Sequence, residues 1–390
     1  MFVKPYFAIP CFIIPPMSTP GSVLHYLAFA LGLITVILTL SSALSTFILP
    51  RAARSQLNRI VFGLLRRMIN FSLHFAKTYR RRDAIMAYYA PIGLMLLLPT
   101  WYILILIGYA TMYWALGAGD LFAVFRLSGS SLFTLGFEIS KTPVVTVFAF
   151  TEAMLGLMLV GLLIAYLPTM YSAFSRREQA VNMLEVRAGS PPSALEMLLR
   201  FNRIHGLDKL SDYWKTWEAW FADVEESHTT LPALVFFRSP RAENSWVTAA
   251  GAVLDCAAIT LSAIEIPYDA SAALCIRAGF LALRRIANYF DLPNPQDPHY
   301  PTTPICVERH EFDEVIDQLA AAGLPIKSDR EQAWRDFAGW RVNYDRALIL
   351  LCGLVMAPQA SWSSDRVPQF SLPPMMVFNK HRLLAEEEQS

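Results

Sequence analysis

Three long apolar runs dominate the first 175 residues of the chain. The first covers 22–50, and the second is centred on 92–114. The third follows Lys141 and has Glu152 as its only charged residue. Each is long enough to cross a bilayer as a helix, which takes about 20 residues. The first is too long for a cleaved signal peptide, and no small-residue cleavage site follows it. The pattern predicts three transmembrane helices.

The sequence after residue 175 has the pattern of a helical domain. Ser190-Pro191-Pro192 is typical of a helix start, and Ser328–Glu331 has the form of a capping box. Trp214, Trp217 and Trp220 recur every three residues, and we expect them to pack in a core. No stretch alternates convincingly with the period of a strand. The predicted fold class is therefore all-α throughout.

Changes of composition divide the chain into six predicted parts. These are an extracytoplasmic N-terminal segment (1–21), a first transmembrane helix (22–50), a basic amphipathic helix (51–83), a membrane module with two further spans (84–175), a helical cytoplasmic domain (176–378) and a disordered tail (379–390). The stretch 246–264 is ambiguous because it is mostly small and apolar. Asp255 at its middle favours a core helix of the cytoplasmic domain over a fourth span.

The charged residues show that the two halves of the chain are built differently. Residues 1–175 carry 12 basic and 4 acidic side chains, a net charge of about +8, whereas residues 176–390 carry 21 and 28, about −7. Because no basic cluster lies outside the membrane-proximal segment, nucleic acid is excluded as a partner. Five cysteines without a CxxC pair indicate buried free thiols in a reducing compartment.

Basic residues concentrate between the first two apolar runs. Residues 51–83 contain nine of them and a single acidic residue, Asp83. The positive-inside rule makes this segment cytoplasmic, so the N-terminus and 117–143 lie outside and the sequence after Arg176 lies inside a plasma (cytoplasmic) membrane.

The same basic segment has the spacing of an amphipathic helix. Apolar residues from Ile60 to Ile69 recur between the arginines, which predicts a helix on the anionic inner leaflet with its arginines toward the lipid phosphates. A solvated connecting helix is the alternative. The arginines assigned to the lipid are Arg51, Arg54, Arg59, Arg66, Arg67, Arg80, Arg81 and Arg82.

The segment 117–143 is too apolar for an exposed loop. Asp120 is a good N-cap, and the following residues to Leu132 predict a helix of about 20 Å, too short to cross the membrane. A short irregular segment, Thr134–Glu138, comes next. A helix that enters the membrane and an irregular segment that leaves it form a re-entrant loop, which requires a protein or water environment.

This order of elements resembles the pore-loop cation channels, and potassium channels in particular. Thr134, Leu135, Gly136 and Phe137 are similar to the first four residues of their T-V-G-Y-G filter. Glu138 stands in place of the second glycine. The resemblance covers about 85–175 and implies a homotetramer, because one pore loop cannot enclose a path.

The resemblance also implies roles for the residues of the filter. Carbonyls of Thr134–Phe137 would replace the hydration shell of monovalent cations, and the carboxyl end of the 120–132 helix would point toward their path. Loss of the second glycine puts potassium selectivity in doubt. A ring of Glu138 carboxylates would instead concentrate cations at the outer mouth. The alternative is a hairpin that conducts nothing, in a membrane-anchored scaffold.

Three further residues lie on the predicted inner helix. Glu152 is an ionisable residue within the membrane and needs a partner or water. Arg126 is a candidate partner, and Glu152 is expected to support the filter or to line a cation cavity; an interfacial position is the alternative. Gly156 has the spacing of the family's gating hinge, although close helix packing accounts better for it and for Gly161.

The cytoplasmic half shows no pattern of enzyme chemistry. His299, Cys306, His310 and Glu311 do not have the spacing of a zinc site. Glu226, Ser227 and His228 are expected at an exposed helix end. No phosphate-binding glycine loop, nucleophile elbow or HExxH motif occurs. We expect no enzyme activity, metal or cofactor, and assign this half to gating or assembly.

Overall fold

The computed structural model describes residues 20–47 and 56–367. Positions 1–19, Arg51, Arg54 and the predicted tail lie outside this part of the chain. Within the described residues the elements are helices, with one isolated β-bridge and no named strand. The all-α prediction is confirmed for them.

The chain folds into two compact units. The apolar unit contains residues 20–47 and 97–164, and the helical domain contains residues 56–96 and 165–367.

Two helices, α4 (Tyr89–Ala115) and α6 (Pro143–Ala188), contribute to both units without a break. Helix α6 is 46 residues long and contains Pro168. The domain boundary predicted near residue 175 therefore falls inside a continuous helix. The sequence signalled a change of environment there, from apolar to charged, but not a change of secondary structure.

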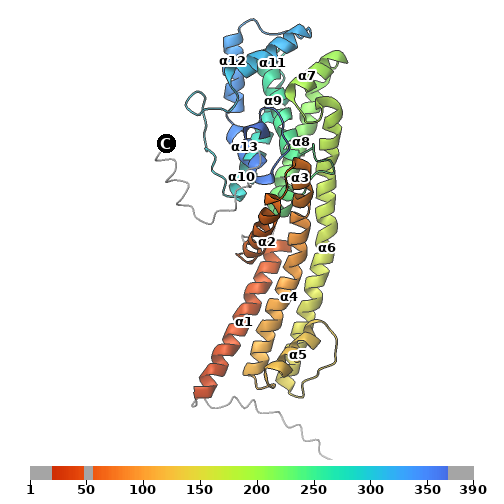
Figure 1. Ribbon diagram of the computed structural model, residues 1–390, viewed down its shortest axis with the longest axis vertical. Helices are drawn as coiled ribbons and strands as arrows, with labels where there is room; N and C mark the ends of the chain where they lie inside the picture. The colour runs from red at the N-terminus through yellow and green to blue at the C-terminus, as the bar shows by residue number, and fades with distance from the viewer. Residues whose placement is uncertain (1–19, 48–55, 368–390) are drawn as a thin grey trace, which may run out of the picture. The chain divides into compact units, whose positions relative to one another are not determined.

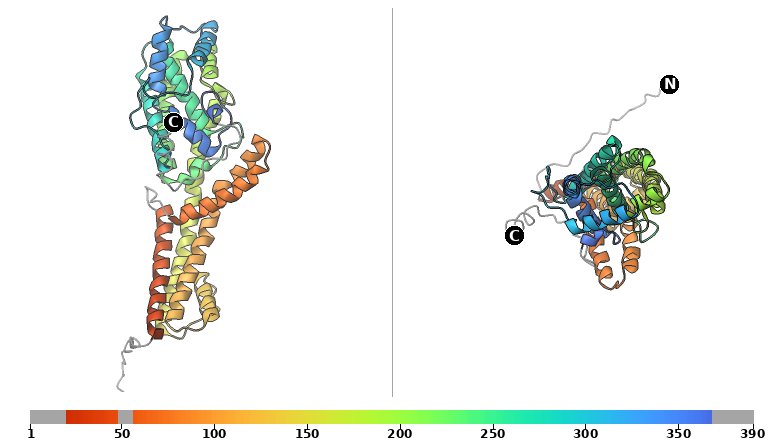
Figure 2. Two further views of the ribbon diagram at one scale, coloured as in Figure 1. Left: turned by 60° about the vertical axis from the view of Figure 1, so that its left-hand side comes forward. Right: turned by 90° about the horizontal axis from the view of Figure 1, so that it is seen from above.

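The apolar unit contains three long helices that run side by side (Figure 1, Figure 2). They are α1 (Pro20–Phe47), α4 (Tyr89–Ala115) from Leu97 onward, and α6 as far as Ile164. A short fourth helix, α5 (Leu121–Leu132), lies between α4 and α6 in the chain.

Glycines let α1 and α4 approach closely. A Cβ atom on Gly32 would lie 2.5 Å from the carbonyl oxygen of Gly108, and one on Gly108 would lie 2.7 Å from Val36 Cγ2. Small residues at such crossings are typical of packed transmembrane helices. Further along the pair, Trp101 Nε1 donates a hydrogen bond of 3.2 Å to Ser42 Oγ.

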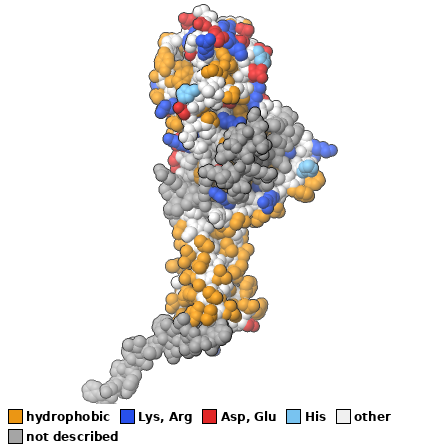
Figure 3. All heavy atoms as spheres, turned by 90° about the vertical axis from the view of Figure 1, so that its left-hand side faces the viewer, with side chains coloured by type: hydrophobic (Ala, Val, Ile, Leu, Met, Phe, Trp, Pro, Cys, Tyr) orange, Lys and Arg blue, Asp and Glu red, His pale blue; other side chains and the backbone are white. Residues whose placement is uncertain are grey.

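The outer surface of the apolar unit is hydrophobic. Large apolar side chains are exposed along each long helix, and orange side chains cover the face seen in Figure 3. Among them are Leu27, Leu31, Ile34, Leu38, Ile103, Ile107, Val147, Phe150, Met154 and Leu157. Such a surface is typical of a membrane-embedded protein, since soluble monomers rarely expose apolar patches of this size.

Four described helices have the length and composition to cross a membrane. They are Val23–Phe47, Tyr79–Ala115 (α3, Tyr79–Ala87, and α4 taken together), Pro143–Ala188 and Trp246–Ala263. The most apolar window of the first three is 17 to 33% buried within the protein, whereas that of the fourth is 94% buried. The fourth is α9, and its surface is covered by other helices, as in a core helix.

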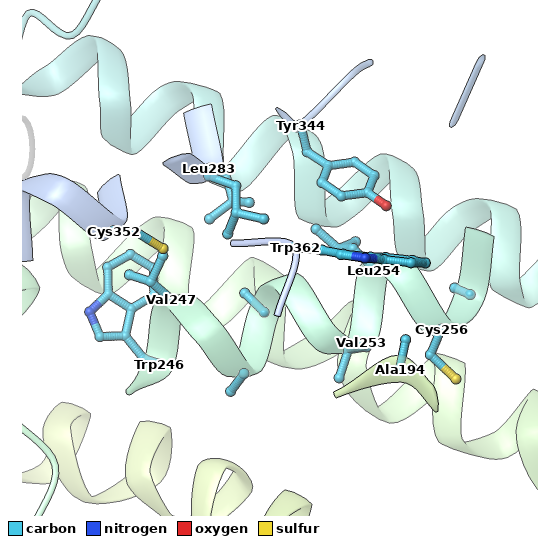
Figure 4. Close-up of a cluster of buried hydrophobic side chains, with 14 of the residues drawn as sticks. Ala194, Trp246, Val247, Val253, Leu254, Cys256, Leu283, Tyr344, Cys352 and Trp362 are labelled. Atoms are coloured by element: carbon cyan, nitrogen blue, oxygen red, sulfur yellow. The ribbon is translucent and has the colours of Figure 1, made fainter. Parts of the chain in front are cut away.

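The helical domain is arranged around α9. The elements are α2 (Gln56–His74), α3 (Tyr79–Ala87), the start of α4, the end of α6, α7 (Ala194–Arg203), η1 (Leu207–Lys209), α8 (Leu210–Thr230), η2 (Pro232–Phe236), α9 (Trp246–Ala263), α10 (Ala270–Tyr289), α11 (Arg309–Ala321), α12 (Arg330–Arg341), α13 (Asp345–Val355) and η3 (Ser364–Arg366). Helices α7, α10, α12 and α13 pack against α9. Figure 4 shows Leu283 of α10 and Cys352 of α13 near α9 side chains.

The three tryptophans of α8 are buried, which confirms the packing prediction.

A buried arginine joins three parts of this core. Arg341 is fully buried and donates to Asp255 of α9 at 2.5 Å, to Asp345 of α13 at 2.8 Å and to the carbonyl oxygen of Trp362 at 2.5 Å. Tyr344 also donates to Asp255, at 2.8 Å. Burial lowers the pKa of Arg341, but the two carboxylates outweigh this effect and raise it well above its ordinary value.

A second buried cluster surrounds Arg177 at the end of α6. The guanidinium donates to the carbonyl oxygens of Leu234 at 2.8 Å and Phe237 at 2.7 Å, and its Nη1 lies 3.1 Å from His228 Nε2. Since Arg177 can only donate, Nε2 accepts and the proton of a neutral imidazole resides on Nδ1. Ser227 and His228 are buried. The expected surface position was wrong for these two residues, because no local pattern indicates that the end of α8 meets Arg177, whereas Glu226 is exposed as expected.

The free energy of unfolding should depend on pH through the protonation of His228. Burial, and then the charge of Arg177, lowers the pKa of His228 well below its ordinary value. Its unfolded-state pKa is about 6.5, so the unfolded chain binds the proton first as pH falls. The contribution of His228 is complete above about pH 6.5 and is lost below it, at up to about 1.4 kcal/mol per pH unit.

Thermal unfolding of the full-length protein, followed from pH 7.5 to 5, measures this dependence. We expect the midpoint of wild type to fall more steeply below about pH 6.5 than that of His228→Gln, which cannot gain the charge. The carboxyl groups titrate in both proteins, so the difference isolates the imidazole. Parallel curves for the two proteins would contradict the assignment.

Candidate functional site

The short helix predicted after Asp120 is present as α5. The Asp120 side chain accepts a hydrogen bond of 2.8 Å from the backbone N–H of Ala123, as an N-cap does. At the other end, the N–H groups of Leu135 and Gly136 both donate to the carbonyl oxygen of Ser130, at 2.8 and 3.4 Å. The chain therefore folds back on the carboxyl end of α5 as soon as the helix ends.

The segment Thr134–Glu138 has no regular secondary structure, as predicted. Thr134 and Gly136 have left-handed backbone conformations, with φ of 53° and 71°. Glycine adopts this conformation readily, but a β-branched residue such as Thr134 does so at a cost of about 1–3 kcal/mol. Strained residues of this kind cluster at functional sites.

Leu135 and Phe137 lie on the surface of the apolar unit. Their side chains are 62% and 56% exposed, and that of Ile139 is 80% exposed. Large apolar side chains at these exposures are suited to lipid or to another copy of the chain, rather than to water.

Glu138 is paired within its own chain. Its carboxylate lies 3.0 Å from Arg126 Nη2, and its backbone N–H donates to Ser130 Oγ at 3.0 Å. The Arg126 guanidinium also lies 5.7 Å from the ring centre of Phe137. The expected pairing of Arg126 with Glu152 is therefore wrong, because α5 directs Arg126 toward the segment that follows it. A carboxylate paired with a guanidinium attracts other cations less than a free carboxylate does.

Glu152 is fully buried at the meeting point of three helices. It accepts hydrogen bonds from Tyr113 of α4 at 2.8 Å and from Ser128 of α5 at 2.5 Å. Ser128 Oγ also lies 3.0 Å from the carbonyl oxygen of Leu106. A buried carboxylate needs such donors. Its partners are thus two hydroxyl groups of the adjacent helices α4 and α5.

Tyr113 and Ser128 were not singled out in the sequence. Both are polar positions within apolar stretches. A search for hydrogen-bond donors on the neighbouring elements of Glu152 could have found them, since an intramembrane carboxylate needs partners.

The two glycines of α6 have different surroundings. A Cβ atom on Gly156 would lie 2.3 Å from the carbonyl oxygen of Leu132, the last residue of α5, and the Gly156 carbonyl accepts from Tyr102 at 2.6 Å. A Cβ atom on Gly161 would meet no described atom within 4 Å. The close approach of α5 therefore requires a residue without a side chain at position 156, as the packing interpretation predicts.

The predicted lipid-facing arginines separate into different environments. Arg66 and Arg82 are buried, so their assignment to lipid phosphates is wrong. Arg66 donates to the carbonyl oxygen of Leu354 at 3.3 Å, and burial lowers its pKa to about 10. Arg80 pairs with Glu243 at 2.8 Å. Of the other described arginines in this set, Arg59 is partly buried. Arg67 and Arg81 are exposed.

The four residues considered for zinc do not come together in the described structure. Cys306 donates its thiol hydrogen to Asp345 at 3.0 Å, and burial raises the pKa of this thiol to about 12. Glu311 accepts from Arg366 at 2.5 Å. A thiol that stays protonated at neutral pH is a poor metal ligand.

Comparison with protein-family models, with curated proteins and with solved structures found no match.

Proposed function

We propose that this chain is the subunit of a homotetrameric, cation-conducting pore-loop channel of the plasma membrane. One observation carries the proposal: buried Glu152 ties α5 to both α4 and α6. A helix too short to cross the membrane is thereby held between two that can, and its carboxyl end leads directly into Thr134–Glu138. This is the geometry that a re-entrant pore loop needs.

In the proposed assembly, four copies of Thr134–Phe137 surround one axis. Their carbonyl oxygens replace the water around a monovalent cation, and the carboxyl ends of four α5 helices add a negative potential. The basic segment after α1 is cytoplasmic by the positive-inside rule. The N-terminus and α5 are then on the outer side, and the helical domain is inside, where it gates or assembles the channel through α6.

The Arg126–Glu138 pair changes the mechanism suggested by the sequence. A ring of four ion pairs has no net charge, so it attracts cations weakly compared with four free carboxylates. Such a pair also favours the second candidate function, a non-conducting scaffold in which this hairpin only completes the packing of the membrane helices.

Current through reconstituted bilayers separates these two functions. Wild type should conduct cations, and Gly136→Ala should reduce the current several-fold, because alanine resists the left-handed conformation at this position. Arg126→Gln should raise cation current at low salt by freeing Glu138, whereas Arg126→Gln combined with Glu138→Gln should not. The double variant is the matched control, since it removes both charges.

Absence of current from wild type that is correctly folded would contradict the channel proposal. So would a current that Gly136→Ala leaves unchanged. The mass of the detergent-solubilised complex gives an independent measurement, because a monomer or dimer cannot enclose a path with one loop per chain.

A further inference from the structure

Helix α2 has two separate apolar faces. One face packs into the helical domain through Leu65, Ile69 and Leu73, each 7% exposed or less. The other is an exposed stripe that follows the helix and the residue after it. The stripe consists of Ile60, Leu64, Met68, Phe71 and Phe75, which are 54 to 70% exposed.

The spacing of the stripe is that of one helix face. Its members are separated by four, four, three and four residues, the intervals that place side chains above one another along a helix. The last two, Phe71 and Phe75, form an edge-to-face pair with ring centres 5.3 Å apart. A soluble surface helix normally has one apolar face and a polar opposite face. A second apolar face is therefore suited to contact with lipid or protein and not with water.

The charged side chains of the segment that carries the stripe are all positive. Residues 56–82 contain no acidic side chain. Arg67 lies seven residues after Ile60 and four before Phe71, at one edge of the stripe, and Arg67, Lys77 and Arg81 are exposed. An apolar face bordered by basic residues is complementary to the boundary between acyl chains and anionic headgroups.

The position of α2 along the chain gives an independent argument. The helix crosses the start of α4, where a Cβ atom on Gly93 would lie 2.2 Å from the ring of Phe62. The apolar run of α4 begins at the same point, near Ile92. In Figure 2, α2 and α3 form an orange helix pair at one side of the helical domain. A helix that crosses a span where its apolar run begins lies at the level of the headgroups.

We infer that the exposed stripe of α2 inserts into the boundary between headgroups and acyl chains of an anionic leaflet. The helix lies in the plane of the membrane, with its other apolar face in the helical domain. The sequence-based prediction also placed this helix on the anionic leaflet. The inference adds that the stripe, and not the buried apolar face, is the part that contacts lipid. It is independent of whether the protein conducts ions.

A fluorophore on Met68→Cys, placed in the full-length protein with Cys11→Ser, tests the insertion. Ile204→Cys is the matched control, because Ile204 is an apolar residue of the same domain with 70% exposure, close to the 69% of Met68. Cys256, Cys275 and Cys352 are buried. Labelling of the parent without the new cysteine measures any background.

The labelled proteins are compared in nanodiscs of phosphatidylcholine with and without phosphatidylglycerol. We expect acrylamide in the water to quench the probe at 68 several-fold less than the probe at 204, and acyl-chain spin labels to quench it several-fold more. Phosphatidylglycerol should strengthen the acyl-chain quenching, and Arg67→Gln with Lys77→Gln should weaken it.

Equal acrylamide quenching at 68 and 204 would overturn the inference, because the stripe would then face water. Protection from both quenchers would also overturn it, since a protein would then cover the stripe. No effect of phosphatidylglycerol would remove the role assigned to anionic lipid.

Discussion

Replacing Gly156 by alanine should displace α5 and abolish conduction. The added methyl group would lie 2.3 Å from the carbonyl oxygen of Leu132, a backbone atom that cannot rotate away. Overpacking of a buried contact typically costs about 1–3 kcal/mol. We expect a lower unfolding temperature of the detergent-solubilised protein and the loss of current in bilayers, since Leu132 is two residues before Thr134.

Gly161→Ala is the matched control on the same helix. No described atom lies within 4 Å of the new methyl group, so the unfolding temperature should stay within the error of wild type. If Gly156 instead acts as a hinge, Gly156→Ala would keep the stability of wild type and change only the opening of the channel. That outcome would contradict the packing interpretation.

Replacing Arg341 by methionine should have the largest effect in the helical domain. It would leave Asp255 and Asp345 buried without their cation, and breaking such a pair costs about 3–5 kcal/mol. Because a domain is stable by only about 5–15 kcal/mol, this change removes a large fraction of the free energy of unfolding. Chemical unfolding of the full-length protein, followed by tryptophan fluorescence, measures the loss.

Arg335→Met on the same helix provides the control. Arg335 makes an exposed pair with Glu331 at 3.2 Å, and such pairs contribute about 1 kcal/mol or less. Arg341→Lys keeps the charge but cannot reproduce the fork of hydrogen bonds, so its stability should be intermediate. Adding Asp255→Asn to Arg341→Met should recover part of the loss. Equal stability of Arg335→Met and Arg341→Met would contradict the role of the cluster.

The elements with strong local signals could be predicted from the sequence. The bounds of α5 follow from an N-cap aspartate and a short apolar run, and the long apolar helices follow from hydropathy. Helix α7 begins at Ala194 with Ser193 as its N-cap, later than the proline pair suggested. The capping signal was present in the sequence, but two prolines nearby outweighed it.

The partners of polar residues could not be predicted in the same way. Local spacing suggested Arg126 for Glu152, whereas the structure pairs Arg126 with Glu138 and gives Glu152 two hydroxyl groups. Arg66 and His228 have the appearance of surface residues in the sequence, yet both are buried by elements that are distant in the chain. Such contacts depend on tertiary packing, which no local pattern contains.

Pro168 makes α6 easier to bend at one turn. The proline has no N–H to donate to the carbonyl of Ile164, so one hydrogen bond of the helix is absent at this position. The apolar unit ends at Ile164, and the helical domain resumes at the next residue. Bending costs less at a proline than in an intact turn. Bending of α6 would therefore concentrate in this turn instead of spreading along the helix.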